Sequence, residues 1–461
     1  MPNRRATPVP SSVPSIHGDT AVVRIESLDY EGNGVARLSG KTVFIEGALP
    51  GDEVRFRYHN KKRNYDTGGV LEILVPSPDR VVPRCRYFGV CGGCSLQHLR
   101  PEAQLREKQQ VLRDSLAHIG KVCPAAWLPP LHGSVWGYRR KARLGVRVVP
   151  KKGGVLVGFR EKRHTFITPL ESCEVLDAGV SALLPALRAL IARLSRPERM
   201  PQIEVAVGDP VGCAPSLALV FRHLEPLTGG DLAQLLEFGQ RHSAQVYLQP
   251  GGPASVAPLW PQDAALAYRL PDQDIELRFR PVDFIQVNAG INQALVARAL
   301  ELLQPRADET VLDLFCGLGN FTLPLARRAR RVLGIEGDVS LVEQARANAA
   351  HNGIANAEFH AADLYMQDGS APWGEEHFDK WLLDPPRTGA MDVVKRLSAD
   401  GSGPRRIVYV SCNPGTLARD SEVLVHVKGY RLASAGVLDM FPHTSHVESV
   451  ALFEATPPAG P

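Results

Sequence analysis

The chain has 461 residues, of which 44% are hydrophobic and 22% are charged, and its formal net charge is +4. This length is enough for two to four domains, and the composition is that of an ordinary globular protein. No apolar run approaches the ~18 residues of a membrane-spanning helix, and the small net charge does not by itself indicate a polyanionic partner.

Residues 1–15 are rich in Pro and Ser and contain no apolar segment. We therefore expect a disordered tail there and not a secretory signal. The protein is then expected to remain in the cytoplasm, where thiols stay reduced. Its eight cysteines are more suited to metal ligation, catalysis or core packing than to disulfides.

Short strands at residues 22–25 and 42–45, separated by glycine turns, predict a small β-barrel over about residues 21–75. In its second half, basic residues alternate with aromatic ones, which favours a nucleic-acid surface because cations bind phosphates and rings stack on bases. A solvated edge strand protected by lysines is the alternative. The residues concerned are Arg55, Phe56, Arg57, Tyr58, His59, Lys61, Lys62, Arg63 and Tyr65.

Three cysteines follow in a short segment, Cys85, Cys91 and Cys94, with Gly92-Gly93 between the last two. Closely spaced thiols around flexible glycines predict a metal site. The spacing does not separate zinc from an iron–sulfur cluster, although it differs from the CxxxCxxC pattern of radical enzymes. The candidates for a fourth ligand are His98, Cys123 and Cys173.

A helix is predicted over residues 99–120, with Pro101 in its first turn and Gly120 at its end. The following region has mainly short strands, with one helical stretch at 182–194. Between Arg139 and Arg163, ten basic residues face a single acid, so we expect RNA contacts there. The predicted strands cover residues 142–149, 202–207, 217–221 and 245–248.

From about residue 280 strands alternate with helices, which predicts a doubly wound, mainly parallel sheet. A strand at 310–315 runs into a glycine turn, Cys316–Asn320, and the next strand ends at Glu336. An acid at that place suits ribose hydroxyls, while the missing third glycine of the dinucleotide pattern favours S-adenosylmethionine, which has no pyrophosphate. Asp363, after a later strand, suits the adenine amino group.

Two more strand ends carry reactive side chains. The strand at 378–383 ends at Asp384, and the strand at 408–410 ends at Ser411-Cys412-Asn413-Pro414. A thiol at the end of a parallel strand is a candidate nucleophile, with a half-buried structural cysteine as the alternative. Two histidines and an acid follow before the last strand, His443, His446 and Glu448.

These motifs together closely resemble the RNA uracil-C5 methyltransferases, and the segment 32–54 resembles the TRAM domain, an OB-like RNA-binding barrel. The resemblance covers nearly the whole chain and is closest to the bacterial enzymes that modify 23S rRNA. The matching segments are Phe284–Asn288, Leu312–Phe321, Asp384–Arg387, Ser411–Pro414 and His443–Glu448.

The resemblance implies a multidomain protein. After the tail come a TRAM-like β-barrel at 16–79, a central mainly β domain with an iron–sulfur site at 80–279, and a Rossmann-like α/β S-adenosylmethionine-dependent methyltransferase domain at 280–461. Part of residues 99–135 is expected to pack on the catalytic domain. The implied partner is 23S rRNA, free or in early large-subunit precursors, with no membrane and with the enzyme acting as a monomer.

The same resemblance implies the site residues. A [4Fe-4S] cluster is expected on Cys85, Cys91, Cys94 and Cys173, which leaves Cys123 and Cys213 structural. Cys412 is the implied nucleophile and Glu448 the implied base. The implied contacts of the methyl donor are Gln286, Phe315, Asn320, Glu336, Asp363 and Asp384.

The chemistry accounts for these residue types, because C5 of uracil is too weak a nucleophile to attack a sulfonium methyl group. Addition of the Cys412 thiolate to C6 creates an enolate that is nucleophilic at C5, and a base then removes the C5 proton. The target base must leave its stack to reach the site. The alternatives are a uracil-C5 enzyme acting on tRNA or another RNA, a base amino-group methyltransferase and a non-enzymatic iron–sulfur RNA-binding protein. The amino-group enzymes carry an aromatic residue where this chain has Arg387.

Overall fold

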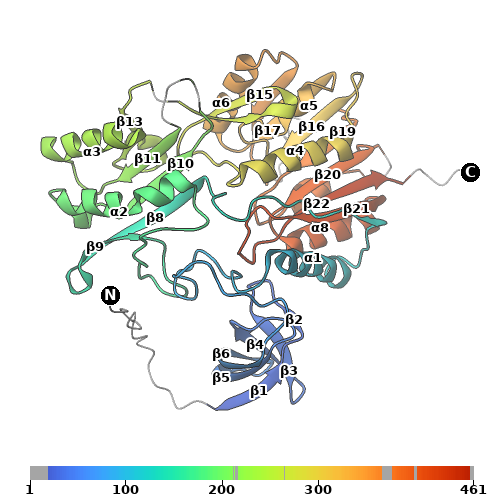
Figure 1. Ribbon diagram of the computed structural model, residues 1–461. Helices are drawn as coiled ribbons and strands as arrows, with labels where there is room; N and C mark the ends of the chain where they lie inside the picture. The colour runs from blue at the N-terminus through green and yellow to red at the C-terminus, as the bar shows by residue number, and fades with distance from the viewer. Residues whose placement is uncertain are drawn as a thin grey trace, which may run out of the picture. The chain divides into compact units, whose positions relative to one another are not determined.

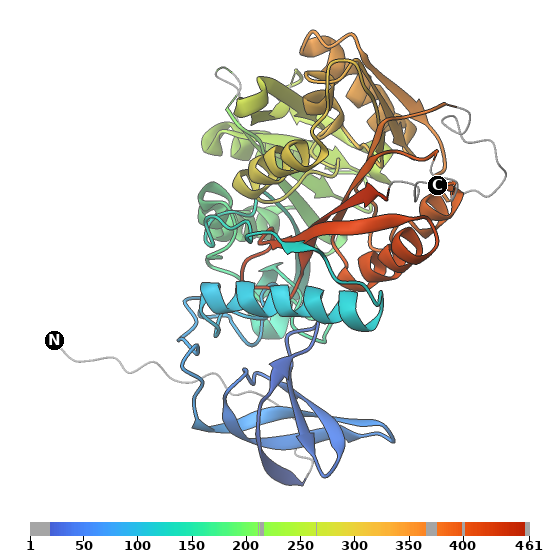
Figure 2. The same ribbon diagram turned by 90° about the vertical axis from the view of Figure 1, so that its right-hand side faces the viewer.

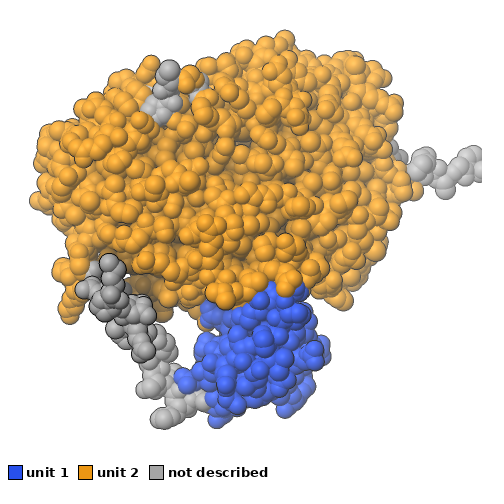
Figure 3. Space-filling view, viewed as in Figure 1, with its two compact units in different colours: residues 1–80 blue, residues 81–461 orange. Residues whose placement is uncertain are grey.

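A computed structural model describes residues 19–210, 212, 216–263, 265–365, 376–398 and 402–456. It divides the chain into two compact units, residues 1–80 and 81–461 (Figure 3). The central and C-terminal regions both lie in the second unit. They share one hydrophobic core, which includes Val220, Leu277, Leu295 and Val408.

The first unit is a six-stranded sheet in the order β1-β5-β6-β4-β3-β2. Buried side chains of Val43, Ile45, Val54 and Phe56 alternate with outward-facing ones, which is the period of a strand with one buried face. The strands are β1 Thr20–Arg24, β2 Ser27–Leu28, β3 Gly34–Leu38, β4 Lys41–Glu46, β5 Glu53–Lys61 and β6 Tyr65–Val75.

Part of the basic and aromatic stretch on β5 is neutralised within the first unit. Arg55 is paired with Glu72, and Lys61 donates to Asp19 at 2.7 Å. Lys61 also lies 4.3 Å from the centre of the Tyr58 ring. The stretch therefore has fewer free cations than the sequence suggests.

The central region contains a second six-stranded sheet, in the order β13-β12-β11-β10-β8-β9. Two helices accompany it, α2 Ala178–Arg193 and α3 Gly229–His242, although the sequence predicted only the first. The missed α3 has a capping box between Thr228 and Asp231, a signal readable in the sequence. The strands are β8 Lys141–Val149, β9 Gly154–Gly158, β10 Gln202–Val207, β11 Leu217–Arg222, β12 Ala244–Gln249 and β13 Ala257–Trp260, and a hairpin of β14 Leu266–Leu270 and β15 Ile275–Phe279 follows.

The basic run that begins at Arg139 is also partly paired. Arg140 donates to Asp209 at 2.6 Å, and the buried Glu204 forms ion pairs with Lys141 and Arg143 at 3.4 and 3.2 Å. These three cations are paired with carboxylates of the same region. Fewer basic side chains are therefore available for RNA phosphates than the ten that the sequence contains between Arg139 and Arg163.

The C-terminal sheet has eight strands in the order β18-β17-β16-β19-β20-β22-β21-β7. Its first five strands are parallel, and β22 runs antiparallel to both β20 and β21. The strands are β16 Thr310–Leu314, β17 Arg331–Glu336, β18 Ala357–Ala361, β19 Lys380–Leu383, β20 Arg406–Ser411, β21 Tyr430–Leu438 and β22 Glu448–Ala455. The helices are α4 Ala289–Leu303, α5 Thr322–Ala326, α6 Val339–His351, α7 Met391–Arg396 and α8 Pro414–His426 (Figure 1).

The eighth strand, β7 Ala126–Trp127, comes from far upstream and pairs in parallel with β21. Helix α1, Pro101–His118, precedes β7 and lies on the same side of the C-terminal sheet as α8 (Figure 2). Gly120 marks a close approach, since a Cβ there would be 2.5 Å from the Ala418 carbonyl oxygen. None of the described helices is long and apolar enough to cross a lipid bilayer.

Candidate active site

Four neighbouring parallel strands, β17, β16, β19 and β20, end at the same edge of the C-terminal sheet. Glu336 is the last residue of β17, and Phe315, Asp384 and Cys412 directly follow the other three strands. The sequence prediction that these strand ends meet is confirmed. This edge is where ligands bind in open α/β sheets.

The strand pairing brings Cys412 and Glu448 together. In the antiparallel pair β20–β22, Ser411 lies opposite Ser449, so the next pair in the same register is Cys412 and Glu448. Side chains of directly opposed residues share one face and have Cβ atoms about 5 Å apart. The charge of Glu448 acts on the Cys412 thiol, so the two groups lie close enough to interact.

Asn413 fixes the thiol-bearing turn. Its Oδ1 atom accepts from the backbone N–H of Gly415 at 3.0 Å and so caps α8, which starts at Pro414. Its Nδ2 atom donates to the carbonyl oxygen of Arg387 at 3.2 Å. One side chain thus ties the Cys412 turn to the Asp384–Arg387 turn.

The ionisable groups at this edge are shifted toward their neutral forms. Burial, followed by the charges of Glu448 and Asp384, raises the pKa of Cys412 to about 11. Burial and then Asp384 raise the pKa of Glu448 to about 8, while Arg387 and Lys108 act in the opposite direction. Burial raises the pKa of Asp384 to about 7. Near neutral pH the carboxyl groups of Asp384 and Glu448 can donate and accept protons, as acid–base chemistry requires.

The two histidines before Glu448 are held as neutral rings. His443 stacks on Trp136 with ring centres 3.9 Å apart, and its backbone N–H donates to Gln104. Burial lowers its pKa to about 4. His446 Nδ1 lies 2.9 Å from Arg387, and burial, followed by that cation, lowers its pKa as well.

The glycine turn after β16 has the backbone of a ligand-binding loop. Phe315, Gly317 and Gly319 all have positive φ, at 67°, 54° and 91°. The Glu336 carboxylate accepts N–H groups from Gly317, Gly337 and Asp338 at 3.1, 2.7 and 3.1 Å, so its position is fixed. Exposed Asp363 accepts the N–H of Tyr365, whose ring centre is 5.9 Å from that of Phe315.

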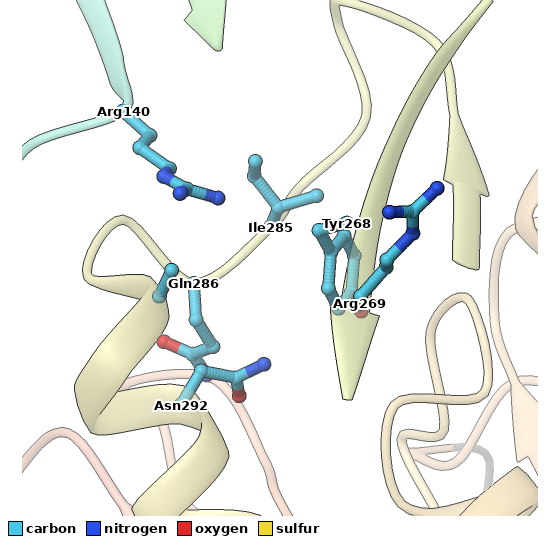
Figure 4. A pocket seen from close by; sticks show the side chains of 7 residues that line it. Arg140, Tyr268, Arg269, Ile285, Gln286 and Asn292 are labelled. Carbon is cyan, nitrogen blue, oxygen red and sulfur yellow. The ribbon is translucent and has the colours of Figure 1, made fainter. Parts of the chain in front are cut away.

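Asn320 is held by two residues that the sequence analysis did not identify. Its amide pairs reciprocally with that of Asn292 at 2.9 and 3.0 Å, and the Tyr268 hydroxyl donates to its Oδ1 at 3.0 Å. Asn292 and Tyr268 also border a small, partly open pocket. In Figure 4, Gln286 lies in the segment just before α4 and Asn292 in the first turn of that helix, and Tyr268 and Arg269 lie on β14. The pocket is lined by Arg140, Tyr268, Arg269, Ile285, Gln286, Ala289 and Asn292.

The cysteines expected to bind a cluster lie near one another as free thiols. Burial and then the neighbouring thiols raise the pKa of Cys91 to about 11, and the thiols of Cys85, Cys91 and Cys173 help raise that of Cys94. The N–H of Gly93 donates to the Cys91 sulfur at 3.4 Å. Among the residues that the structure describes, no three His, Cys, Asp or Glu side chains form a group able to hold a single metal ion.

The other ligand candidates have different surroundings. The His98 ring lies 5.1 Å from that of Phe88. Cys123 is exposed and its thiol lies 3.7 Å from the Pro124 carbonyl oxygen. Cys213 lies outside the described residues.

Comparison with known proteins adds independent information. The family model described as tRNA (uracil-5-)-methyltransferase matches residues 263–364 and 373–456, and the TRAM domain model matches residues 14–71. A protein of Thiobacillus denitrificans named 23S rRNA (uracil(1939)-C(5))-methyltransferase RlmD is 56% identical over 94% of this chain and 99% of its own length. Its namesake in Aromatoleum aromaticum is 54% identical with the same coverage.

Among solved structures, the tRNA (uracil-54, C5)-methyltransferase of Pyrococcus abyssi, in complex with S-adenosyl-L-homocysteine, is similar to this chain. The TM-score is 0.69 and the identity 26%, and the match covers 94% of this chain and 99% of that one. The similarity therefore extends over the central and C-terminal regions together.

Proposed function

The chain belongs to the RNA uracil-C5 methyltransferase family, and from this premise we infer that it transfers a methyl group from S-adenosylmethionine to C5 of a uridine in 23S rRNA. We propose that the target is the uracil named in its relatives, uracil 1939. One observation supports the chemistry above all others, namely the pairing of Ser411 with Ser449, which carries Cys412 and Glu448 to the same edge of the sheet as the glycine turn.

A direct test combines purified protein with S-adenosylmethionine and either a 23S rRNA fragment or a tRNA transcript. The expected product is 5-methyluridine in the rRNA fragment alone, located by mass spectrometry of nuclease fragments. Methylation of the tRNA alone would support the function of the Pyrococcus neighbour instead. A methyl group on an exocyclic amine would indicate the amino-group chemistry.

Methyl transfer begins at Cys412. Its thiolate adds to C6 of the uracil, so that an Sγ–C6 bond forms and electron density moves to C5. C5 then takes the methyl group of S-adenosylmethionine, and S-adenosylhomocysteine leaves. The carboxylate of Glu448 removes the proton from C5, the C5–C6 double bond forms again, and the Sγ–C6 bond breaks to release the thiolate. Arg387 favours the anionic forms of both protein groups.

The proposed methyl-donor site uses Gln286, Phe315, Asn320, Glu336, Asp363 and Asp384. Two observations support it, the positive φ angles of the glycine turn and the fixed carboxylate of Glu336, which accepts three N–H groups and keeps one lone pair for a ribose hydroxyl. The Asn320 side chain already has protein partners, so it acts there chiefly by holding the turn.

We expect Asn292→Ala to weaken the binding of S-adenosylmethionine about tenfold. The variant loses the amide pair that orients Asn320, and the free energy of one net hydrogen bond corresponds to about a tenfold change in Kd. Calorimetric titration measures the Kd. The control is Asn356→Ala, which removes amide contacts to the carbonyl oxygens of Ala326 and Ala329, away from the strand ends. Equal affinity in wild type and Asn292→Ala would show that the amide pair does not support the methyl-donor site.

We further propose a [4Fe-4S] cluster on Cys85, Cys91, Cys94 and Cys173. The four free thiols influence one another electrostatically, and Gly92 and Gly93 let the backbone turn tightly around them. When bound, such a cluster would join the segment 85–94 to Cys173 by covalent metal–sulfur bonds.

Protein purified without oxygen is expected to be brown and to contain about four iron atoms per chain. Cys91→Ser should lose most of the iron and colour, whereas Cys123→Ser, at an exposed thiol, should keep both. Iron analysis and visible absorbance make the comparison. One zinc per chain without visible absorbance would contradict the cluster assignment.

A further inference from the structure

Helix α1 carries a buried lysine under the loop that leads to Glu448. The side chain of Lys108 is 2% exposed, and its Nζ atom donates to Asp439 Oδ1 at 2.7 Å and to the carbonyl oxygen of Phe441 at 2.9 Å. Lysine is almost never fully buried unless it is paired, because removing an ammonium group from water is costly. The contacts with Asp439 and Phe441 offset that cost, so Lys108 and the loop hold each other in place.

The loop in question comprises residues 439–447, which join the end of β21 to Glu448 at the start of β22. One turn before Lys108 on α1, Gln104 binds the same loop. Its Oε1 atom accepts the N–H of His443 at 2.8 Å, and its Nε2 atom lies 3.1 Å from His443 Nδ1. The side chains at positions i and i+4 of α1 thus hold two points of the loop.

The ammonium group of Lys108 also acts on Glu448 at a distance. It lowers the pKa of Glu448. Burial lowers the pKa of Lys108 itself, and the charge of Asp439, followed by that of Glu448, opposes this effect. Because Lys108 is buried, solvent and salt screen its charge less than that of Arg387, which lies on the exposed side. The lysine is thus a fixed, poorly screened cation behind the proposed base.

We propose that Lys108 is a positioning residue for removal of the C5 proton, which holds the 439–447 loop in place and increases the fraction of Glu448 in its carboxylate form. The proposal rests on the proposed function. Lys108 lies on α1, and neither of the proposed catalytic residues, Cys412 and Glu448, belongs to this helix. Addition of Cys412 to C6 and transfer of the methyl group do not use Glu448. The rates of these two steps should therefore depend on Lys108 much less than the rate of product release does.

The direction of the pH effect follows from the charges around Glu448. Asp384 raises its pKa, and Arg387 and Lys108 lower it; Cys412 also faces it across the strand pair. On the loop itself, Asp439 is the ion partner of Lys108, and His443 and His446 are neutral near pH 7. Removing Lys108 therefore raises the pKa of Glu448, and proton removal needs a higher pH.

The experiment follows the wild-type enzyme with 23S rRNA and S-adenosylmethionine across pH 6 to pH 10, with the rate of product release measured separately from a single-turnover methyl transfer. In Lys108→Met the midpoint of the release profile should move to higher pH by roughly one unit, the scale of one nearby charge. At pH 7 release should then be about tenfold slower, with the methylated adduct accumulating. Lys108→Arg should restore much of the wild-type profile.

Two further variants separate this role from simple destabilisation. Lys108→Met with Asp439→Asn removes both charges of the pair, so no unpaired buried ion remains. Lys380→Met is the matched control, because Lys380 forms an equally buried pair with Glu309 at 2.6 Å, at the opposite end of β19. Lys380→Met should lose stability but keep the wild-type pH midpoint.

An unchanged pH midpoint in folded Lys108→Met and in the double variant would overturn the proposal, as would the same shift in Lys380→Met. Absence of C5 methylation by the wild-type protein would refute the proposed function instead, so the two failures are distinguishable.

Discussion

Cys412→Ala is expected to reduce methyl transfer by roughly 10⁴- to 10⁶-fold, the scale on which enzymes lose activity when their nucleophile is removed. Without the thiolate no bond to C6 forms, and C5 stays too electron-poor to take the methyl group. Binding of S-adenosylmethionine should change little, because its proposed contacts come mainly from the glycine turn, Glu336 and the start of α4. Labelled methyl transfer measures the first effect and calorimetric titration the second.

The matched control for this variant is Cys123→Ala. The Cys123 thiol is exposed, and Cys123 belongs to none of the strands whose ends form the site. Cys123→Ala should retain wild-type turnover. Turnover of Cys412→Ala near the wild-type rate would refute covalent catalysis by this thiol.

Glu448→Gln is expected to halt the reaction after methyl transfer. Addition of Cys412 to C6 and transfer of the methyl group need no base at this position, whereas release requires removal of the C5 proton. A neutral amide accepts protons far less readily than a carboxylate, so the methylated RNA should remain bonded to the enzyme. A denaturing gel with RNA labelled through the methyl group should show a protein–RNA band that persists.

Glu454→Gln provides the control, because Glu454 lies on the same strand and forms surface ion pairs with Arg406 and Arg431. It should release product normally. Free methylated RNA released at the normal rate by Glu448→Gln would exclude this carboxylate as the base. A loss of folding without any adduct would indicate that Glu448 only stabilises the start of β22.

The sequence predicted the parts of the site that depend on backbone pattern. Apolar runs followed by small or acidic residues placed Phe315, Glu336, Asp384 and Cys412 at one edge, since parallel strands align their carboxyl ends. The opposition of Cys412 and Glu448 required the register of β20 and β22, which is set by pairing across the sheet and is not visible in either strand alone.

Other residues escaped sequence reasoning for a different physical reason. Lys108 and Asn292 lie inside amphipathic helices, where polar residues are ordinarily read as facing water. Only the tertiary contacts show that each is buried with a specific partner. Helix α3 was missed although its capping box was present, because its polar residues and glycines weaken the helical pattern.

The pairing of β7 with β21 and of Lys108 with Asp439 has a consequence for synthesis of the protein. Lys108 and Asp439 are separated by 331 positions. At a synthesis rate of ~5–20 residues per second, α1 leaves the ribosome roughly 15 to 65 seconds before its partner loop exists. During that interval the face of α1 that is buried in the folded protein has no partner, so its apolar residues and Lys108 remain exposed on the nascent chain. A fragment that begins near residue 280 would face the same problem permanently, since the outer edge of β21 would stay open and Asp439 would lack its cation.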